Sequence, residues 1–160
     1  MDHQALIQVS DAIGGFGSDS GHAAPSVPAS NVTTTELSAV RGPVFIIDDD
    51  DWVCDSLSVL LEAYGFTVAA YPSAAAFLED GHRDRAKCLI VDQHMPGMDG
   101  LDLIGVLRTL GPSVPAILIT GRVDAGIKER ADLLGVLGVL EKPFAVSRLV
   151  ELIDSAVAPS

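Results

Sequence analysis

The sequence predicts an α/β fold in which helices cover both faces of a parallel β-sheet, the arrangement called a doubly wound sandwich. From Pro43 onward, short apolar runs alternate with amphipathic segments, and this pair occurs five times. The runs are continuously apolar, which is typical of strands buried on both faces of a sheet. Right-handed crossovers between such strands give the doubly wound arrangement.

The first two strands and helices follow from residue type and spacing. Residues 44–47 are β-branched or aromatic and predict a strand that ends abruptly at an aspartate. Over residues 52–64 the apolar side chains recur at helical spacing, and Gly65 predicts the end of that helix. Residues 66–71 predict the second strand. Ser73 is the expected N-cap of a short helix that extends to residue 79.

The rest of the chain repeats this alternation three times. Apolar runs predict strands over residues 88–91, 116–119 and 136–140. Helical spacing predicts the segments that follow them, over residues 101–110, 124–134 and 145–157. A Gly-Pro pair ends the first of these helices, and Asp124 stands near the start of the second.

The composition excludes several classes of protein. Of the 160 residues, 48% are hydrophobic, which is enough for a core and excludes disorder over the whole chain. The formal net charge of −12 argues against general binding to nucleic acid or anionic lipid, because both are negatively charged. Cys54 and Cys88 are too few for a disulfide framework or a four-ligand zinc site, and we expect buried free thiols.

The chain divides near residue 42. Residues 1–42 are rich in Ser, Thr and Gly, and we expect a flexible tail there, with a short docking helix over residues 3–13 as the alternative. Residues 43–157 form the expected domain, and residues 158–160 a C-terminal tail. Since there is neither a secretory signal nor an apolar run near the roughly 20 residues of a membrane span, we expect a cytoplasmic protein.

Polar residues follow four of the predicted strands at the point where each strand ends. Asp48 and Asp49 follow the first strand, Asp92 the third, Thr120 the fourth and Lys142 the fifth. Sites in such sheets form beyond the carboxyl ends of the strands, so these side chains are expected to converge at one edge. The Lys-Pro sequence after the fifth strand predicts a cis peptide bond.

This set of residues suits phosphoryl transfer. Asp48 and Asp49 would repel each other unless a cation binds, and an oxygen-only ligand set favours Mg²⁺. A carboxylate can attack phosphorus and form an aspartyl phosphate, while a lysine and a metal offset charge on the phosphoryl oxygens. Asp50 and Asp51 are expected either to be solvated or to cap the next helix.

Four motifs make residues 43–157 resemble the receiver domain of two-component response regulators. They are Phe45-Ile46-Ile47-Asp48-Asp49, Asp92-Gln93-His94-Met95-Pro96-Gly97-Met98-Asp99-Gly100, Ile119-Thr120-Gly121 and Glu141-Lys142-Pro143-Phe144. Tyr71-Pro72-Ser73-Ala74 and Ala76-Phe77-Leu78 resemble the nitrogen-fixation-regulator subtype, and the intervals between motifs fit that subtype without insertion. The resemblance implies a flavodoxin-like fold with strand order 2-1-3-4-5.

The resemblance also implies a phosphoacceptor and a metal site. Asp92 would accept a phosphoryl group from a sensor histidine kinase or a phosphotransfer protein. Asp49 would bind Mg²⁺ directly and Asp48 through water, with Asp92 and the backbone carbonyl of His94 among the protein ligands. Such a domain signals and catalyses only its own phosphorylation and dephosphorylation.

Lys142 would pair with the phosphoryl group, and Thr120 would swing toward it, shifting the last two helices and the fifth strand. The family often has Phe or Tyr three residues before this lysine, where the present sequence has Val139. The threonine–aromatic relay of the family is therefore not expected in its usual form. Helix movement or surface charge would carry the output instead.

Residue 160 comes soon after the last predicted helix, and no basic recognition helix is present. We therefore expect a single-domain receiver that signals through an unidentified downstream protein, without direct contact to nucleic acid or membrane. A homodimer would use the helix over 124–134, the strand over 136–140 and the helix over 145–157. The alternative is that the chain is a fragment of a longer regulator.

Two other functions are alternatives to the receiver. A haloacid-dehalogenase-type phosphatase would use Asp48 as its nucleophile, but its first motif requires Gly-Thr where this chain has Asp51-Trp52. The second is a scaffold of the receiver fold that is not phosphorylated. The complete acidic set and Lys142 argue against that scaffold.

Overall fold

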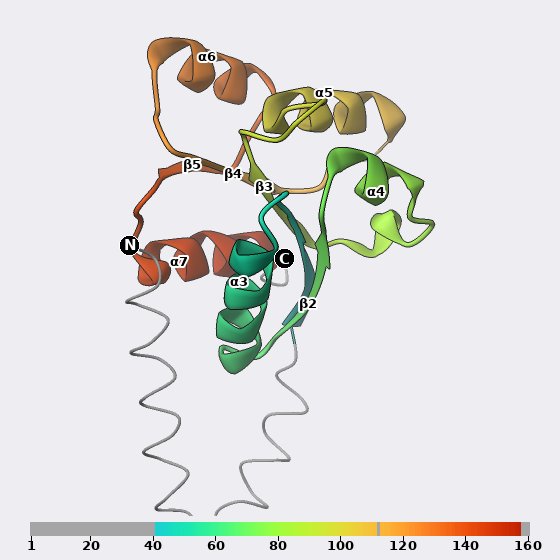
Figure 1. Cartoon of the computed structure of the whole chain (residues 1–160), viewed down its shortest axis with the longest axis vertical. Helices are drawn as coiled ribbons and strands as arrows, with labels where there is room; N and C mark the ends of the chain where they lie inside the picture. The colour runs from blue at the N-terminus through green and yellow to red at the C-terminus, as the bar shows by residue number, and fades with distance from the viewer. Residues whose placement is uncertain (1–40, 112, 158–160) are drawn as a thin grey trace, which may run out of the picture. The chain divides into compact units, whose positions relative to one another are not determined.

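The computed structural model describes residues 41–111 and 113–157 (Figure 1). The predicted N-terminal tail, except for its last two residues, lies outside the described residues. The alternative helix over residues 3–13 and the C-terminal residues 158–160 also lie outside them. Arg41 and Gly42 belong to the first strand, so that strand begins three residues before the apolar run that predicted it.

Strands and helices alternate along the described chain as the sequence predicts. The first half contains β1 (Arg41–Ile47), α3 (Asp51–Ala63), β2 (Phe66–Tyr71), α4 (Ala74–Glu79) and a 3₁₀ turn, η1 (Arg83–Arg85). The second half contains β3 (Cys88–Asp92), α5 (Gly100–Leu110), β4 (Ala116–Thr120), α6 (Ala125–Leu133), β5 (Gly138–Glu141) and α7 (Val146–Val157). The turn η1 is the one described element that the sequence did not predict.

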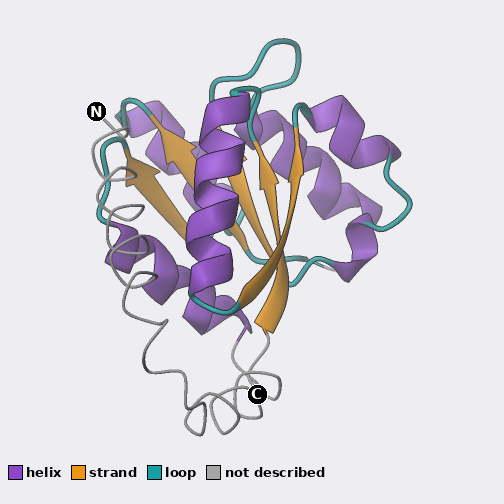
Figure 2. Ribbon diagram, turned by 60° about the horizontal axis from the view of Figure 1, so that its bottom comes forward, coloured by secondary structure: helices purple, strands orange, loops and turns teal. Residues whose placement is uncertain are grey.

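The five strands form one parallel sheet in the order β2-β1-β3-β4-β5, which confirms the predicted flavodoxin-like order. Helices α3 and α7 cover one face of the sheet, and α4, α5 and α6 cover the other (Figures 1 and 2). Each face has its own cluster of buried apolar side chains. The doubly wound sandwich is therefore confirmed.

Burial differs between central and edge strands, as a covered parallel sheet requires. Every residue of β3 and β4 is buried, and so are the last four residues of β1. The edge strands β2 and β5 contain exposed positions. Cys54 and Cys88 are buried free thiols within one core cluster, as predicted. None of the described helices is long and apolar enough to cross a membrane.

Side-chain caps begin four of the helices close to the ends of the strands. Asp50, Ser73, Asp99 and Asp124 each accept a hydrogen bond from a backbone N–H in the first turn of the helix that follows. Such caps satisfy N–H groups that have no partner within the helix. Each cap fixes the first turn of its helix on the side of the sheet where the preceding strand ends.

Gly100 begins α5 at a point where the backbone leaves no room for a side chain. A Cβ atom there would lie 2.6 Å from the backbone oxygen of Asp92 and 3.0 Å from the Cα of Gln93. Both neighbours are backbone atoms and cannot rotate away. The close packing of α5 on the end of β3 therefore depends on glycine.

We predict that Gly100→Ala lowers the free energy of unfolding by about 1 to 3 kcal/mol, because the methyl group overpacks a rigid site. Gly105→Ala in the same helix is the matched control, since a Cβ there meets only the Leu134 side chain at 3.9 Å. That change is expected to stabilise the protein by up to about 1 kcal/mol through helix propensity. Urea denaturation measures both, and equal effects of the two substitutions would contradict the argument.

Candidate functional site

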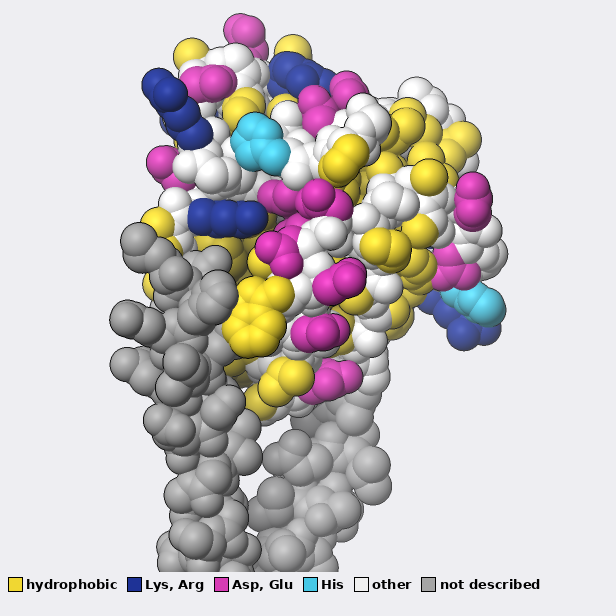
Figure 3. Space-filling view, viewed as in Figure 1, with side chains coloured by type: hydrophobic (Ala, Val, Ile, Leu, Met, Phe, Trp, Pro, Cys, Tyr) yellow, Lys and Arg dark blue, Asp and Glu magenta, His cyan; other side chains and the backbone are white. Residues whose placement is uncertain are grey.

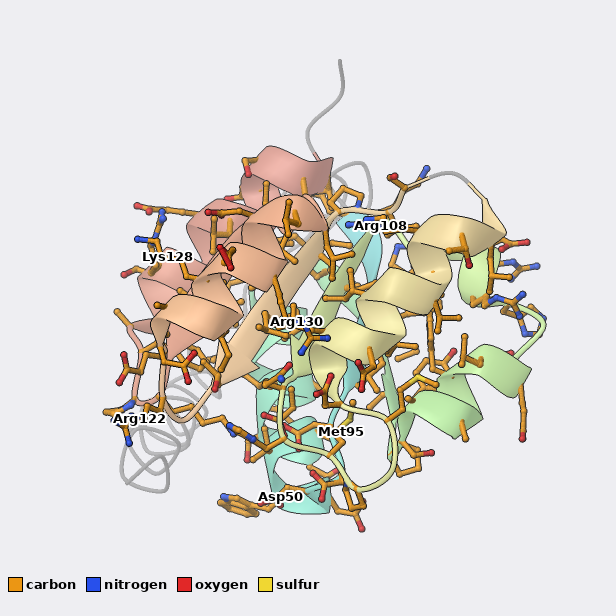
Figure 4. The ribbon with its side chains drawn as sticks, turned by 90° about the horizontal axis from the view of Figure 1, so that it is seen from above. Asp50, Met95, Arg108, Arg122, Lys128 and Arg130 are labelled. Atoms are coloured by element: carbon orange, nitrogen blue, oxygen red, sulfur yellow. The ribbon has the colours of Figure 1, made fainter. Side chains whose placement is uncertain are left out.

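The strand register brings the predicted site residues to one edge of the sheet. Ile47 of β1 pairs with Val91 of β3, so the residues that follow them, Asp48 and Asp92, stand at the same level. Asp92 pairs with Ile119, next to Thr120, and Lys142 follows the last residue of β5. In Figure 4, Asp50, Met95 and Arg122 mark the loops after β1, β3 and β4 at this edge, and Arg108 lies at the far end of α5.

Three carboxylates form the acidic centre of this edge. Asp48, Asp49 and Asp92 each offer an oxygen, and these oxygens all lie within 4.8 Å of one another. Asp48 is 3% exposed and Asp92 is 5% exposed, whereas Asp49 is exposed. Figure 3 shows acidic side chains gathered above α3 and along it. Three negative charges at this separation, two of them removed from water, repel one another strongly.

Burial raises the pKa of Asp48 to about 6. The backbone N–H of Asp50, which donates to Asp48 Oδ1 at 2.9 Å, acts in the opposite direction. The negative charge of Asp92 adds to the rise, and Lys142 lowers it. The carboxylate of Asp48 is therefore held in its charged form at a cost in free energy.

Asp92 is the carboxylate paired with a cation. Lys142 Nζ lies 3.4 Å from Asp92 Oδ1, close enough for an ion pair but without the alignment of a hydrogen bond. Burial raises the pKa of Asp92, and the Lys142 ammonium lowers it. The peptide bond between Lys142 and Pro143 is cis, as predicted.

The acidic centre fits a divalent cation. Asp92 Oδ1 is buried and makes no hydrogen bond within the described part of the chain, although a buried carboxylate oxygen normally has a partner. Asp92 belongs to a set of three carboxylates, which offers oxygen ligands alone. Hard oxygen ligands of this kind suit Mg²⁺, which keeps several of its waters.

Thr120 is fully buried, and its hydroxyl has three polar neighbours. Thr120 Oγ1 donates to the backbone oxygen of Arg122 at 3.0 Å and accepts from the backbone N–H of Arg122 at 3.3 Å. The Nε2 atom of His94 lies 3.2 Å from the same oxygen. The sequence predicts a role for the backbone carbonyl of His94 alone, so it did not predict this contact of the His94 side chain.

Gln93 is a further residue whose part in the site the sequence did not predict. Its side chain is buried, and Oε1 accepts a hydrogen bond from the backbone N–H of Leu101 at 2.9 Å. Its backbone oxygen accepts another from Gly100 at 3.1 Å. Gln93 thus fastens the start of α5 to the end of β3 and fixes the loop that carries His94. A polar residue directly after a buried strand was the one available signal.

The family model of the response regulator receiver domain matches residues 44–154. The chain belongs to this family. Receiver domains are signalling domains of two-component systems, and they interact with histidine kinases or phosphotransfer proteins. The family match confirms the resemblance to receiver domains.

Curated relatives support the nitrogen-fixation-regulator subtype. The receiver is 38% identical over 118 residues to the transcriptional regulatory protein FixJ of Azorhizobium caulinodans, covering 74% of this chain and 56% of that protein. It is 37% identical over 114 residues to the response regulator protein TodT of Pseudomonas putida, covering 71% and 50%. The receiver thus spans about half the length of the curated relatives it matches.

Solved structures agree with the observed fold. The crystal structure titled FixJ-N is 36% identical, with a TM-score of 0.66 over 71% of this chain and 91% of that one. The response regulator StyR is 33% identical, with a TM-score of 0.68 over 74% and 60%. The chemotaxis protein CheY4 of Vibrio cholerae, at 22% identity and a TM-score of 0.67 over 73% and 99%, shows the shared fold.

We predict that Asp48→Asn stabilises the receiver in EDTA by about 1 to 3 kcal/mol at pH 7, because it removes a buried charge whose pKa is raised to about 6. The folded protein binds this proton more tightly than the unfolded chain does. Wild type therefore loses stability as the pH rises from about 4 to about 6, and the variant lacks this loss.

Urea denaturation between pH 4 and pH 8 measures the difference between the two proteins, which should grow across that window and then level off. Asp55→Asn is the control, since Asp55 is an exposed carboxylate on α3. It is expected to change stability by less than about 0.5 kcal/mol. A variant at Asp48 no more stable than this control would contradict the assigned cost of the buried charge.

Proposed function

We propose that the receiver takes part in a phosphorelay by accepting a phosphoryl group on Asp92, with a histidine kinase or a phosphotransfer protein as the donor. The observation that carries this assignment is the pairing of Asp92 with Lys142, 3.4 Å apart, at the buried edge of the sheet. Asp48 and Asp49 have no such cation in contact within the described residues. Of the three carboxylates, Asp92 is therefore the one best placed to receive a phosphoryl group.

The transfer balances as a displacement at phosphorus. A carboxylate oxygen of Asp92 forms the new O–P bond while the P–N bond of the donor phosphohistidine breaks. The imidazole leaves with the electron pair of that bond and takes a proton. The buried surroundings of Asp92 exclude bulk water from the acceptor, which strengthens its interaction with the Lys142 ammonium.

Lys142 places positive charge where the phosphoryl oxygens would lie. Its side chain is 31% exposed and extends from the end of β5 toward Asp92, so it can follow a group added to that carboxylate. Asp48, Asp49, Asp92 and the backbone carbonyl of His94 would hold Mg²⁺. When bound, the metal supplies charge that offsets the phosphoryl oxygens.

Thr120 and the surface beyond it would transmit the change. A phosphoryl oxygen on Asp92 can accept a hydrogen bond from the Thr120 hydroxyl. The movement of Thr120 toward that oxygen would then displace the loop between β4 and α6. Val139, half-buried against the core, takes the place of the family aromatic residue, so the signal would pass through α6 itself. Phosphorylation then biases an equilibrium between two arrangements.

We further propose that the output is a protein contact on the face formed by α6, β5 and α7, either with a second copy or with a downstream protein. Leu137, just before β5, is 38% exposed, whereas the more exposed Leu133 lines the groove between α5 and α6. An exposed leucine next to the segment that would move is suitable for such a contact.

We predict that acetyl phosphate with Mg²⁺ adds one phosphoryl group to wild type and none to Asp92→Asn. Trp52, the one tryptophan, is 47% exposed at the start of α3 near the acidic centre. Its fluorescence is expected to change with Mg²⁺ and to change further with acetyl phosphate or beryllofluoride. Intact-mass and peptide mass spectrometry locate the adduct.

Asp48→Asn is the matched control for the acceptor, because it also removes one buried carboxylate from the same edge. It should retain the capacity for an adduct on Asp92, although at reduced Mg²⁺ affinity. A stable phosphoryl adduct on Asp48 in wild type would instead support the phosphatase chemistry. Wild type that shows neither an adduct nor a response to Mg²⁺ would support the scaffold.

We predict that Lys142→Ala retains Mg²⁺ binding and lowers the rate of phosphorylation by at least about tenfold, because one charge-assisted interaction with the phosphoryl group is lost. Lys128→Ala is the control, since this exposed lysine lies on α6 away from Asp92 (Figure 4). Stopped-flow fluorescence with acetyl phosphate measures both rates. Equal rates in the two variants would remove Lys142 from the mechanism.

A further inference from the structure

The hydroxyl of Thr120 lies within hydrogen-bonding distance of three polar groups. A threonine hydroxyl has one proton to donate and two lone pairs to accept with. Its proton goes to the backbone oxygen of Arg122, which can only accept. The Arg122 N–H donates to one lone pair, and the tautomer of His94 with its proton on Nε2 would donate to the other across 3.2 Å.

A phosphoryl group on Asp92 requires a different arrangement of this hydroxyl. Its oxygens are acceptors, so Thr120 must donate to them and must first release the Arg122 oxygen. Rotation of the Thr120 side chain toward the phosphoryl group would move Oγ1 and break its contact with His94. The His94 side chain therefore holds Thr120 against the movement that the proposed function requires.

We propose that His94 is a positioning residue whose side chain holds Thr120 on the loop after β4, a contact that we call the latch. The strength of this contact sets how readily the receiver switches. This inference rests on the proposed function, because it concerns the response of Thr120 to a group on Asp92. His94 is exposed, and its ring nitrogen Nε2 contacts the Thr120 hydroxyl. The residue thus has two separable parts, a backbone carbonyl at the metal site and a side chain at the latch.

The latch continues through Arg122 to α6. Arg122 meets Thr120 with its backbone, and it lies two residues before Asp124, the N-cap of α6. Release of Thr120 therefore frees the backbone that leads into this helix. Figure 4 shows Arg122 in the loop at the site edge, and it shows Arg130 of α6 directed toward α5.

Helix α6 is lightly fastened, so a small change at Thr120 can move it. Ala131 is its one buried side chain. Arg130 ties it to α5 through Asp102 at 3.0 Å and Asp99 at 3.9 Å, and all three side chains are partly exposed. Exposed ion pairs of this kind contribute little to stability.

The test is a titration of beryllofluoride at saturating Mg²⁺, followed by Trp52 fluorescence. His94→Ala is expected to lower the half-saturating concentration by about two- to tenfold, the range that one net hydrogen bond accounts for. His94→Gln, whose amide nitrogen can reach the same oxygen, is expected to restore a value near that of wild type. His82→Ala is the matched control, since His82 is an exposed histidine paired with Asp80.

A double-substitution cycle separates the latch from a general effect of His94. In a Thr120→Ala background the hydroxyl is absent, so His94→Ala should change the half-saturating concentration no further. The NMR signal of the Thr120 methyl group should shift in His94→Ala without any phosphoryl analogue, and stay in place in His82→Ala.

The outcomes distinguish the two proposals. If wild type shows no response to beryllofluoride that depends on Asp92, the proposed function fails. If wild type responds but His94→Ala binds beryllofluoride equally well or more weakly, the latch is overturned while the proposed function stands. An effect of His94→Ala that persists in the Thr120→Ala background would also overturn the latch.

Discussion

Two carboxylates buried side by side at the ends of β1 and β3 impose the constraint on which the rest of the structure depends. Asp48 and Asp92 lie in register on adjacent strands, in surroundings that favour neither charge. Lys142 and one backbone N–H offset part of this cost. The remaining repulsion means that binding a positive charge at this edge of the sheet lowers the free energy. This is the physical basis for binding a metal and orienting a phosphoryl group.

The acidic residues of this protein serve different physical purposes according to their place along a strand–loop–helix unit. The carboxylates at the end of a buried strand or directly after it, Asp92 and Asp48, lie in the site. Those one or more residues later, Asp50, Asp99 and Asp124, cap the following helices. Capping aligns the first turn of each helix against the edge, so the same residue type builds both the site and the walls that hold it.

The fold and the convergence of the site were predictable because they depend on periodicity. Continuous apolar strands require a parallel sheet with both faces covered, and parallel strands bring Asp92, Thr120 and Lys142 to one edge whatever the loops do. The strand order came from the resemblance alone. The contact between His94 and Thr120 was not predictable, because it depends on the rotamer of one exposed side chain. The role of Gly100 depends on a backbone approach between β3 and α5 that no local pattern records.

The light attachment of α6 has a consequence for the environment in which the protein works. Four side chains of α3 and three of α7 are buried in the core, and this burial does not depend on attraction between charges. Helix α6 buries one side chain, Ala131, and adds the ion pairs of Arg130 with two partly exposed aspartates, whose attraction is screened within a Debye length of about 8 Å at physiological ionic strength. Salt is therefore expected to weaken the tie between α6 and α5, so the ionic strength of the solution would alter how readily α6 moves when Thr120 is released.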